Sequence, residues 1–470
     1  MADVLIVGGG ISGLAAAYYV RQQGLSAAIV EGSKRLGGLI GTETRFGCRL
    51  EMGPDSWIAS KTAVADLAGS IPGLAEQIIG SNDPARRIFV VKDGQLTPLP
   101  HGMVMMVPGE WAPALRSRLF DNGTKLGFVS EYFQRPRTRH EDVTIAEFVT
   151  DHFSEAMLEY VTEPLLSGVY GGQTGKLSAR SVLPRFVGYE QRYGSLIRGV
   201  RRERRLAKKQ KQRGSLFQSF HNGMQTLVDR LSDELEAQQV RIVHGQADNV
   251  EPAAGGRWRV RVGDSSEVAA QVVIACPAYR AAALMNRSSD PLSRELSAIP
   301  YSSAITVMTG FRQEAVGHAL NGFGFLVPRR ERKTLAACTW VNTKFPTRVA
   351  PEYAVLRSFL VDRNADELML APDQELIDIV RSELKSLMGI TAPVEFFTVN
   401  RWPHSMPQYV VGHEARRYRI EEQMRNYAGL HLLGNAYDGV GIPDCVRLAK
   451  DAARRIARHA KRGHVEYSAG

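Results

Sequence analysis

The alternation of apolar and polar stretches at the start of the chain predicts a strand, a helix and a second strand. Residues 3–7 are largely apolar and predict a short buried strand, and Ala27–Val30 predict another that ends at Glu31. The helix-like stretch between them ends near Gln23, before Gly24. This order of elements predicts a βαβ unit with a right-handed crossover.

The rest of the chain divides into a mainly helical part and a part dominated by strands. Residues from about 60 to 200 predict helices, with an apolar stretch at Met103–Val107 and a helix that ends before Pro164. Residues 300–400 predict mostly strands. The remaining strands and the last helix are expected at residues 240–245, 257–262, 272–275, 304–310, 354–360 and 446–458.

The composition is that of an ordinary globular protein. Of the 470 residues, 44% are apolar and 23% are charged. The four cysteines lie far apart without a CxxC pair, and the histidines form no HExxH cluster. We therefore expect no disulfide framework and no zinc site, and reduced thiols fit a cytoplasmic protein. The first apolar run is too short for a signal peptide, and no stretch approaches the roughly 20 apolar residues of a membrane-spanning helix.

Most of the net charge of +10 is concentrated in one segment. Residues 198–213 hold nine basic residues and one acid, a net of +8, so the rest of the chain is near +2. A local patch of this kind argues against a nucleic-acid-binding protein. A solvated loop or helix face is the ordinary explanation. A docking patch for an acidic lipid surface or partner, or a rim that attracts an acidic substrate, stays open.

A glycine-rich turn follows the first predicted strand, with the spacing Gly8-x-Gly10-x-x-Gly13. Gly8 permits the tight turn, Gly10 lets the backbone approach a pyrophosphate, and Gly13 lets helix and strand pack closely. The helix N-terminus offers free N–H groups to phosphates. Glu31 can accept hydrogen bonds from ribose hydroxyls and disfavours a 2′-phosphate. The unit therefore predicts a dinucleotide site.

Two further segments favour FAD over NAD. Arg35 and Gly37-Gly38 follow Glu31 in the pattern E-x-x-x-R-x-G-G, which resembles the extended FAD signature of the glutathione reductase/amine oxidase superfamily. The glycine-rich segments 433–436 and 439–444 resemble the part that closes the FAD site there, where a helix N-terminus would stabilise the reduced flavin. The predicted cofactor-binding residues are Gly8, Gly9, Gly10, Ile11, Ser12, Gly13, Glu31, Gly32, Arg35, Leu36, Gly37, Gly38, Gly53, Pro54, Asp55, Ser56, Val250, Gly434, Asn435, Val440, Gly441 and Ile442.

Longer motifs narrow the family. Gly53–Trp57, Pro164–Gly172, Leu177–Ser181 and Gly439–Cys445 together resemble the oxygen-dependent protoporphyrinogen oxidase family, which includes the bacterial coproporphyrinogen III oxidases. The resemblance covers nearly the whole chain. It implies oxidation of a porphyrinogen to a porphyrin in haem biosynthesis, through three hydride transfers to N5 of a non-covalent FAD, with O2 reduced to H2O2. No catalytic side chain is expected, because the flavin carries the chemistry.

The resemblance also implies substrate contacts. Gly168 matches a glycine whose carbonyl faces the tetrapyrrole, and Phe323 and Leu326 match an apolar pair that packs against its rings. Such a pair in a strand is ordinarily plain core. An arginine that the mitochondrial and plant enzymes carry after Leu99-Pro100 is missing, because His101–Met105 stands there.

Residues 336–340 and 356–357 look more like the Gram-positive coproporphyrinogen oxidases. Coproporphyrinogen carries four propionates and protoporphyrinogen two, so a basic pocket mouth would suit the former, with Arg357 as a candidate carboxylate partner. Pairing of Arg357 with a neighbouring acid is an equal alternative. The sequence leans towards coproporphyrinogen and leaves both substrates open.

We expect a protein of the α/β and α+β classes with three parts. These are a discontinuous Rossmann-like FAD-binding domain (1–75, 215–285 and 405–470), a mixed-sheet substrate-binding domain (76–100 and 286–404) and a mainly helical insertion (101–214) with the basic loop 198–213. The expected location is the cytoplasm. Peripheral attachment to the inner face of the membrane, or contact with a ferrochelatase-type partner, stays open.

Two other functions fit parts of the sequence. An FAD-dependent amine oxidase or a carotenoid desaturase would share the fold, and many amine oxidases attach flavin through a cysteine. Cys445 lies near the FAD segment, but its Pro-Asp-Cys context belongs to the porphyrinogen oxidase pattern. A non-catalytic docking protein that keeps FAD for structure would account for the basic segment. Flavin release on acid precipitation, and deletion of residues 201–213, would discriminate among these functions.

Overall fold

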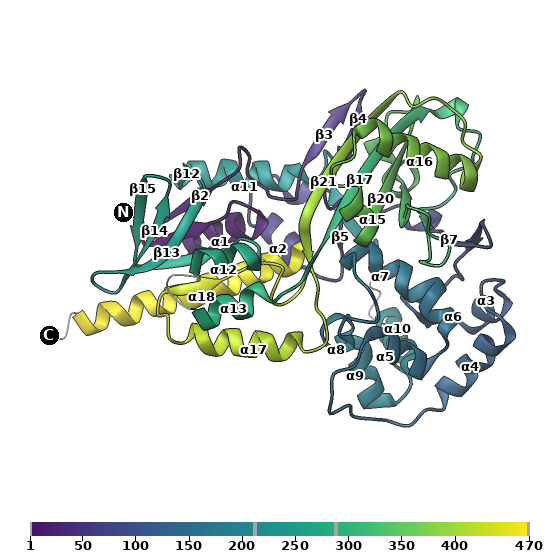
Figure 1. The fold of residues 1–470 in the computed structure, drawn as a ribbon, viewed down its shortest axis with the longest axis horizontal. Coiled ribbons are helices and arrows are strands. Elements are labelled where there is room, and N and C mark those ends of the chain that lie inside the picture. The colour runs from purple at the N-terminus through teal and green to yellow at the C-terminus, as the bar shows by residue number, and fades with distance from the viewer. Residues whose placement is uncertain (1, 210–213, 286–289, 468–470) are drawn as a thin grey trace.

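A parallel five-stranded sheet forms the first layer of the computed structural model, which describes residues 2–209, 214–285 and 290–467. Its strands, in spatial order, are β12 (Arg241–His244), β2 (Ala27–Glu31), β1 (Val4–Val7), β16 (Gln271–Ile274) and β22 (Leu430–Leu432). Every neighbouring pair runs parallel. Segments from both ends and the middle of the chain therefore build one sheet (Figure 1).

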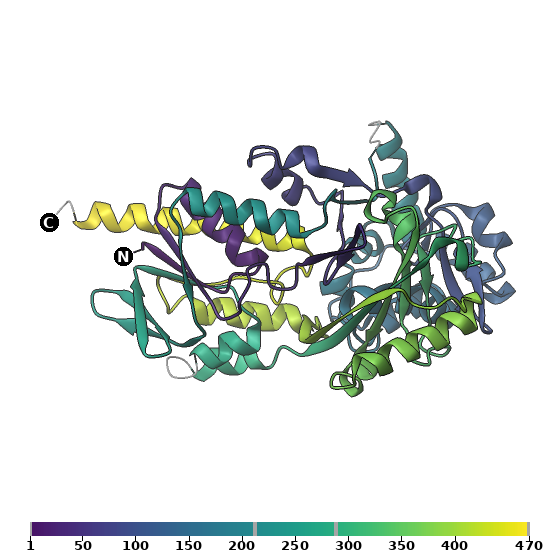
Figure 2. The same ribbon diagram turned by 90° about the horizontal axis from the view of Figure 1, so that it is seen from above.

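Both faces of this sheet are covered. One face packs on α1 (Ile11–Gln22), α2 (Ala63–Ala68), α11 (Gln225–Ala237) and α18 (Ile442–Tyr467), and the other on α12 (Ala278–Met285), α13 (Asp290–Ser297), α17 (His413–Met424), β13 (Ala247–Ala253), β14 (Arg257–Val262) and β15 (Ser265–Ala269). Val4 and Ile6 of β1 lie in the first core, and Leu5 and Val7 lie in the second. Successive side chains of a strand face opposite ways, so a strand buried on both sides is apolar throughout. Figure 2 shows the two groups of covering elements on opposite sides of the sheet.

A seven-stranded mixed sheet forms the second body. Its order is β21 (Phe396–Pro407), β17 (Tyr301–Arg312), β20 (Tyr353–Val361), β19 (Ala337–Trp340), β18 (Gly324–Leu326), β7 (Ile88–Lys92) and β8 (Gln95–Pro98). Only β18 and β7 pair in parallel; the other neighbours are antiparallel. The predicted fold class, a Rossmann-like unit with a mixed-sheet part and a helical part, is confirmed. The domain boundaries stay a prediction.

Helix α16 (Asp373–Met388) covers the seven-stranded sheet and was not predicted. Its Leu376, Val380 and Leu384 share a core with the strands. These residues recur every fourth position, which is the period of a helix rather than a strand. The expectation that strands dominate residues 300–400 is therefore incomplete.

The insertion is mainly helical and has its own core. It contains β9 (Met103–Val104), β10 (Val107–Pro108), α3 (Trp111–Arg116), α4 (Asn122–Tyr132), α5 (Ile145–His152), α6 (Glu155–Met157), α7 (Glu163–Tyr170), α8 (Ala179–Val182), α9 (Pro184–Tyr193) and α10 (Leu196–Lys209). The apolar stretch near Met105 forms the two short strands β9 and β10 and a turn between them.

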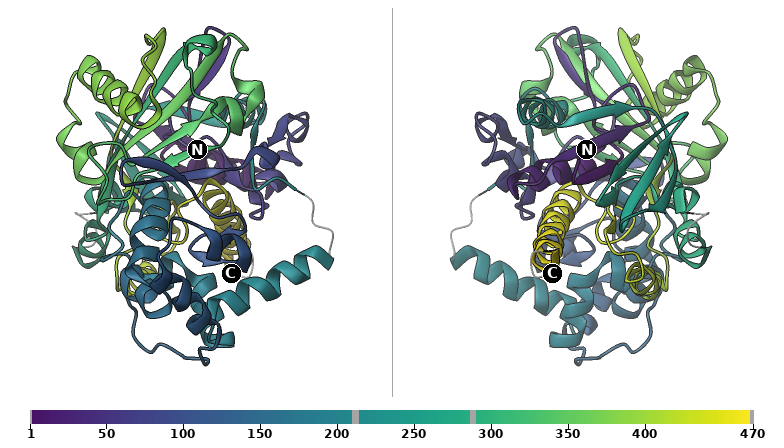
Figure 3. Two further views of the ribbon diagram at one scale, coloured as in Figure 1. Left: turned by 90° about the vertical axis from the view of Figure 1, so that its right-hand side faces the viewer. Right: turned by 90° about the vertical axis from the view of Figure 1, so that its left-hand side faces the viewer.

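Two predictions in the insertion are wrong. The chain does not leave the helix before Pro164, because a wide helical turn at Leu158–Thr162 leads directly into α7. Pro164 then lies in the first turn of α7, directly after the wide turn, where it removes one backbone donor without ending the helix. The basic segment 198–213 is helical up to Lys209 rather than a loop, and residues 210–213 lie outside the described residues. Figure 3 shows α10, in teal, projecting from the insertion.

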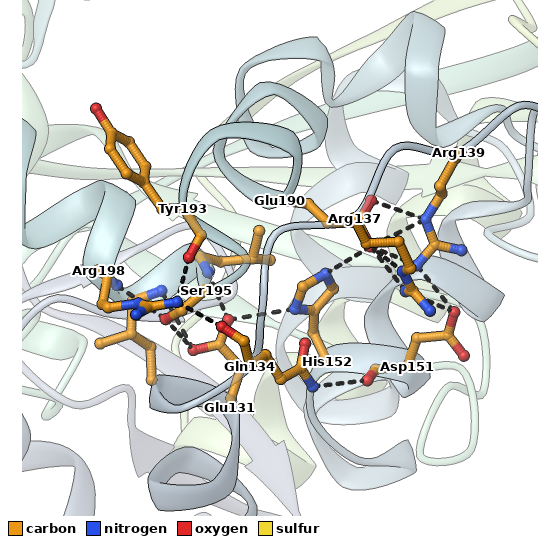
Figure 4. Close-up of polar contacts among 12 residues, drawn as sticks. Glu131, Gln134, Arg137, Arg139, Asp151, His152, Glu190, Tyr193, Ser195 and Arg198 are labelled. Atoms are coloured by element: carbon orange, nitrogen blue, oxygen red, sulfur yellow. Dashed lines mark hydrogen bonds and ion pairs between the residues drawn. The ribbon is translucent and has the colours of Figure 1, made fainter.

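A buried chain of charged residues ties the helices of the insertion together (Figure 4). The ring of His152 lies between Glu131 and Glu190, with each ring nitrogen 3.2 Å from a carboxylate oxygen. Glu131 also accepts hydrogen bonds from the first backbone N–H groups of α10. Glu190 is bound by Arg137 and Arg139. The start of the basic helix is therefore anchored through His152.

Short elements complete the fold. They are β3 (Thr42–Arg45), β4 (Cys48–Glu51), β5 (Trp57–Ile58), β6 (Ile78–Gly80), β11 (Phe217–Phe220), α14 (Val341–Lys344), α15 (Asp362–Glu367) and the single turns η1 (Ala75–Gln77), η2 (Asp83–Ala85), η4 (Gln313–Ala315) and η5 (Pro346–Arg348). Within the described residues, no helix has both the length and the apolar character needed to cross a membrane. No described group of histidine, cysteine, aspartate and glutamate side chains is arranged to hold a metal ion.

Candidate functional site

The candidate site lies at the carboxyl edge of the parallel sheet. A side chain added at Gly8, after β1, would meet the carbonyl oxygen of Ala275 at 2.7 Å, and one at Gly434, after β22, would lie 3.9 Å from the carbonyl of Cys276. The loops after β1, β16 and β22 therefore lie side by side. Because β1 has β2 on one side and β16 on the other, its loop is at the point where the strand order reverses, which is where such sheets bind ligands.

The glycines of the first loop differ in what surrounds them. A Cβ at Gly13 would lie 1.8 Å from the carbonyl oxygen of Gly8, so packing alone requires glycine there. A Cβ at Gly10 would meet only the Cα of Gly38, at 3.9 Å. Within the described residues, no side chain caps the start of α1. The open backbone at Gly10 and the uncapped N–H groups fit a pyrophosphate.

Glu31 connects the first loop to the segment after β2. One of its carboxylate oxygens accepts a hydrogen bond from the N–H of Gly9 at 2.6 Å, and the other accepts one from the N–H of Ser33 at 2.6 Å. A carboxylate oxygen can accept more than one hydrogen bond. Glu31 is therefore held in place at the loop and keeps the capacity to accept bonds from ribose hydroxyls.

Arg35 organises the double-glycine segment from within. Its guanidinium donates hydrogen bonds of 2.6 Å to the carbonyl oxygens of Ile40 and Gly38. The N–H of Gly37 donates to the carbonyl of Gly9 at 2.8 Å, and Gly37 has a φ of 101°, which favours glycine. The second glycine segment thus lies directly against the first loop.

The C-terminal glycine-rich segment ends at the N-terminus of α18. Asp444, in the first turn of α18, accepts a hydrogen bond from the N–H of Gly441 at 3.2 Å and pairs with Lys61 at 2.7 Å. Helix α18 packs along α1. Burial raises the pKa of the Cys445 thiol to about 11, and a hydrogen bond with Ser12 only partly offsets this. The first turns of α1 and α18 are therefore neighbours.

Tyr409 supports this segment and was not predicted from the sequence. Its hydroxyl donates to the carbonyl of Asn435 at 2.7 Å and accepts from the N–H of Gly439 at 2.9 Å. The ring of His413 stacks on Tyr409, with ring centroids 4.0 Å apart. No local pattern in the sequence distinguishes a tyrosine that bridges two backbone groups from an ordinary core tyrosine.

The structure brings most of the predicted cofactor residues to one place. The loop after β1, residues 31–38, the turn 53–56 and residues 434–442 all border the carboxyl edge of the sheet or contact a segment that does. Val250 is different, because its side chain is fully buried in the core between the sheet and β14. Any cofactor contact of Val250 therefore comes from its main chain.

The predicted substrate residues come from two parts of the fold. Gly168 lies on α7, is exposed, and a Cβ there would meet nothing within 4 Å. Phe323 directly precedes β18 and is 6% exposed, and Leu326 ends that strand and is half-buried. Helix α7 contacts β20, which belongs to the same sheet as β18. Their role as substrate contacts stays a prediction.

Arg357 pairs with an acid of its own chain. It is 4% exposed, and its guanidinium lies 3.7 Å from the carboxylate of Asp55 and donates to the carbonyl of Gly53. Its guanidinium also lies 4.6 Å from the centre of the Phe359 ring. Of the two alternatives for Arg357, these contacts correspond to the internal ion pair.

Asp55 is also bound by Lys344, which was not among the predicted residues. The Lys344 ammonium lies 2.7 Å from the Asp55 carboxylate. Burial disfavours the charged carboxylate, but the cations of Lys344 and Arg357 outweigh burial and hold the pKa of Asp55 well below its usual range. Burial lowers the pKa of Lys344, and Asp55 partly offsets this. Lys344 and Asp55 are far apart in sequence, so only the fold brings them together.

Comparison with known proteins places the geometry in context. The sequence matches the family described as flavin containing amine oxidoreductase over residues 11–457. Coproporphyrinogen III oxidase of Bacillus subtilis (strain 168) is 33% identical over 464 residues, which cover 96% of each chain. Coproporphyrinogen III oxidase of Staphylococcus aureus (strain NCTC 8325 / PS 47) is 30% identical over 466 residues, 97% of this chain and 98% of the relative.

A solved structure has the same overall fold. It comes from Exiguobacterium sp. 255-15 and is named as a candidate protoporphyrinogen oxidase. The two chains are 32% identical, superpose with a TM-score of 0.84, and overlap over 97% of this chain and 98% of the other.

Proposed function

Since this chain belongs to the flavin-containing amine oxidoreductase family, we propose that it is an FAD-dependent oxidase that converts a porphyrinogen to a porphyrin. The cofactor is FAD, and the protein is an oxidoreductase. Two relatives that match along almost their whole length are named coproporphyrinogen III oxidase, which favours coproporphyrinogen III as the substrate. Protoporphyrinogen IX is the alternative, favoured by the name of the Exiguobacterium protein.

The observation that carries the proposal is the set of loops at one sheet edge with the chemistry of a dinucleotide site. The uncapped start of α1 and the open backbone at Gly10 suit the pyrophosphate, and Glu31 suits a ribose. The start of α18 suits the electron-rich end of the flavin ring. A bound FAD would supply the hydride acceptor for this oxidation.

The substrate side of the proposal needs few polar groups. The half-buried Leu326 offers apolar surface to a tetrapyrrole, with the almost buried Phe323 near it in the sequence, and the exposed backbone at Gly168 leaves room for its edge. No described side chain is required as a general base, because pyrrole protons can leave to water. We propose that O2 is the final electron acceptor and that it is reduced to H2O2.

One assay tests this function. Purified protein is mixed without oxygen with each porphyrinogen, air is then admitted, and porphyrin fluorescence and H2O2 are followed. We expect porphyrin and H2O2 to form together, faster with coproporphyrinogen III. Failure to oxidise either porphyrinogen would refute the proposal. Oxidation of an aliphatic amine instead would assign the chain to the amine oxidase class.

We also propose that the flavin is held without a covalent bond. Cys445 lies in the first turn of α18, and its side chain is buried. Burial also raises its pKa to about 11, so the nucleophilic thiolate is scarce. Acid precipitation should leave yellow colour in the supernatant. Colour that stays in the pellet would contradict this.

A peripheral membrane contact is the proposed location. Leu126, Val129 and Phe133 are 70%, 42% and 72% exposed, and their spacing places them on one side of α4, with Phe133 as the residue directly after it. The basic helix α10 packs beside α4, with the guanidinium of Arg201 6.0 Å from the ring of Tyr132. Exposed apolar side chains next to a basic helix suit an anionic lipid surface.

Sedimentation with lipid vesicles tests this contact. The protein should sediment with phosphatidylglycerol vesicles and not with phosphatidylcholine vesicles, and the variant Leu126→Ser/Phe133→Ser should lose most of this binding. Leu370→Ser is the matched control, because Leu370 is 95% exposed but lies outside the insertion. If the wild type stays in the supernatant with both lipids, the membrane contact is refuted.

A further inference from the structure

Three buried cations from the substrate-side part of the chain contact the turn 53–56 of the predicted flavin site. They are Lys344 at the end of α14, Arg348 at the end of η5 and Arg357 on β20, and we call them the cation cluster. Their exposed fractions are 9%, 1% and 4%. Charged side chains are almost never buried to this degree unless they are paired, so each has a specific partner to account for.

The partners are concentrated in one turn, Gly53–Ser56. Lys344 donates to the Asp55 carboxylate at 2.7 Å and to the Ser56 hydroxyl at 3.2 Å. Arg348 donates to the backbone carbonyl of Asp55 at 3.2 Å, and Arg357 donates to the backbone carbonyl of Gly53. Three cations therefore hold both the backbone and the side chains of a single turn.

The same turn lies against the double-glycine segment on its other side. A Cβ at Gly53 would lie 1.9 Å from the carbonyl oxygen of Leu39, the residue after Gly38. The preceding residue, Met52, donates its N–H to the carbonyl of Gly41 at 2.8 Å. A shift of the turn therefore shifts the segment that contacts the first glycine loop.

Arg348 extends the connection further into the FAD-binding part. Its guanidinium pairs with Glu51 at 2.9 Å and donates to the backbone carbonyl of Phe220 at 2.9 Å. Glu51 also accepts the N–H of Met224, at the start of α11, at 2.9 Å. Within the described contacts the cluster has three cations against two carboxylates, so one positive charge is in excess. Replacing buried ion pairs by apolar residues is often neutral or stabilising, so we attribute the cluster to positional specificity rather than to stability.

We propose that Lys344, Arg348 and Arg357 are positioning residues of the flavin site, which hold the Gly53–Ser56 turn in place from the substrate-side sheet. Arg357 is accordingly a ligand of the turn rather than of a substrate propionate. This inference rests on the proposed function, because it takes the turn as part of the flavin site. It makes the sheet that carries the substrate residues also the support of the cofactor.

A charge-removal series tests the positioning role. Lys344→Met leaves the Asp55 carboxylate without its closest cation, so FAD should bind about tenfold or more weakly to the apoprotein. The visible absorption spectrum of the bound flavin should also shift. Lys344→Met/Asp55→Asn removes the uncompensated charge but still lacks this tie to the turn, so its FAD affinity should stay below that of the wild type. Arg312→Met is the control, because Arg312 lies on β17 of the same sheet and pairs with Glu395 at 3.6 Å, away from the turn.

The readouts separate positioning from simple stability. If Lys344→Met lowers the unfolding temperature of the apoprotein but leaves the FAD affinity and the flavin spectrum unchanged, the cluster is only structural and the proposal is overturned. Should the single variant fail to fold, the double variant and Arg348→Lys carry the test. The double variant removes one positive and one negative charge together, and Arg348→Lys keeps the positive charge. Equal FAD affinity in all of these variants and the wild type would overturn the proposal in the same way.

Arg357→Lys distinguishes the two roles of Arg357. A positioning role predicts a changed flavin spectrum and a lower kcat, with KM changed by the same factor for coproporphyrinogen and protoporphyrinogen. A propionate ligand would instead raise KM for the tetracarboxylate selectively and leave the spectrum intact, which would overturn the assignment. The FAD measurements need no porphyrinogen, so a wild-type enzyme that fails to oxidise any porphyrinogen would refute the proposed function without touching this inference.

Discussion

Gly10 and Gly13 of the first loop have different structural roles. Gly13 is fixed by packing, because any side chain there would overlap the carbonyl of Gly8, 1.8 Å from the added Cβ. Gly10 has φ −69° and ψ 177°, a conformation open to any residue, and has space around it. The protein itself therefore does not require glycine at residue 10, and a ligand is the remaining physical reason for it.

The variants Gly10→Ala and Gly13→Ala should consequently fail in different ways. Gly10→Ala should keep the apoprotein unfolding temperature within about 2 °C of the wild type while weakening FAD binding about tenfold or more. Gly13→Ala should lower the unfolding temperature of the apoprotein itself. Calorimetric unfolding and FAD titration measure both quantities. Gly188→Ala on α9 is the control for added helix propensity, worth up to about 1 kcal/mol. Unchanged FAD affinity in Gly10→Ala would show that the ligand does not approach this residue.

The role of a residue could be predicted from the sequence when its interaction partners lie close to it in the sequence. The tight spacing of Gly8, Gly10 and Gly13 is a local signal, and the packing role of Gly13 is visible in the structure. Arg357 was open between a propionate and an internal acid, because its partner Asp55 is distant in sequence. Pairings of this kind depend on the fold, so residue types alone could not decide between them.

At the scale of elements, the periodic and glycine-bounded segments were the predictable ones. The strands β1 and β2 and helix α1 begin and end close to the expected residues. Helix α16 was missed although its apolar residues follow a helical period, because its strand-rich surroundings dominated the interpretation. The buried network around His152 gave no sequence signal, since its members come from four separate segments of the insertion.

The His152 network predicts a pH-dependent stability of the insertion. Burial opposes protonation of His152, but hydrogen bonds from the ring to Glu131 and Glu190 outweigh it and raise the pKa of His152. The His152 contribution is therefore complete below the unfolded pKa of about 6.5 and is lost as the pH rises through the higher folded value. The pKa of Glu190 is lowered to about 2, despite burial, by His152, Arg139 and Arg137. Its contribution is present above the unfolded value of about 4.5 and lost as the pH falls towards 2.

The change His152→Gln tests this element. It leaves two buried carboxylates without their shared cation, and should cost about 3–5 kcal/mol of unfolding free energy at pH 6. The cost should shrink as the pH rises, because wild-type His152 then loses its charge as well. Urea unfolding at about pH 6 and pH 9 measures both, with the exposed residue change His244→Gln as the control. A wild-type stability that does not fall between these two pH values would argue against a buried imidazolium.

At the scale of the whole molecule, charge is distributed unevenly. Residues 198–213, most of which belong to α10, carry +8 of the net +10. Helix α10 lies in the insertion at one end of the molecule, and α18 extends from the other end (Figure 1). A field of this kind raises the encounter rate of acidic ligands at one end, and salt screens it over about 10 Å at 0.1 M. A tetracarboxylate substrate should respond to this field more strongly than a dicarboxylate one.

The expected result is a kcat/KM that falls as ionic strength rises from about 0.02 to 0.5 M, more steeply for coproporphyrinogen than for protoporphyrinogen. The variant Arg202→Gln/Arg205→Gln should flatten the salt dependence, because both side chains are exposed on α10. Arg455→Gln/Arg458→Gln removes the same charge from exposed positions of α18 and serves as the control. Identical salt slopes for the two double variants would assign α10 no part in substrate capture.

Strand β22 completes the parallel sheet, and α18 completes the site. This order matters for how the protein folds during its synthesis. A chain leaves the ribosome from its N-terminus, so β1, α1 and β2 emerge first. The strands and helices that they pack against are synthesised much later. The neighbour of β16 and the helix beside α1 do not exist until residues 430–457 have been synthesised. We therefore expect FAD to bind only after these residues have been made, and a ribosome-bound chain that ends before residue 430 should expose the glycine loop but retain no flavin.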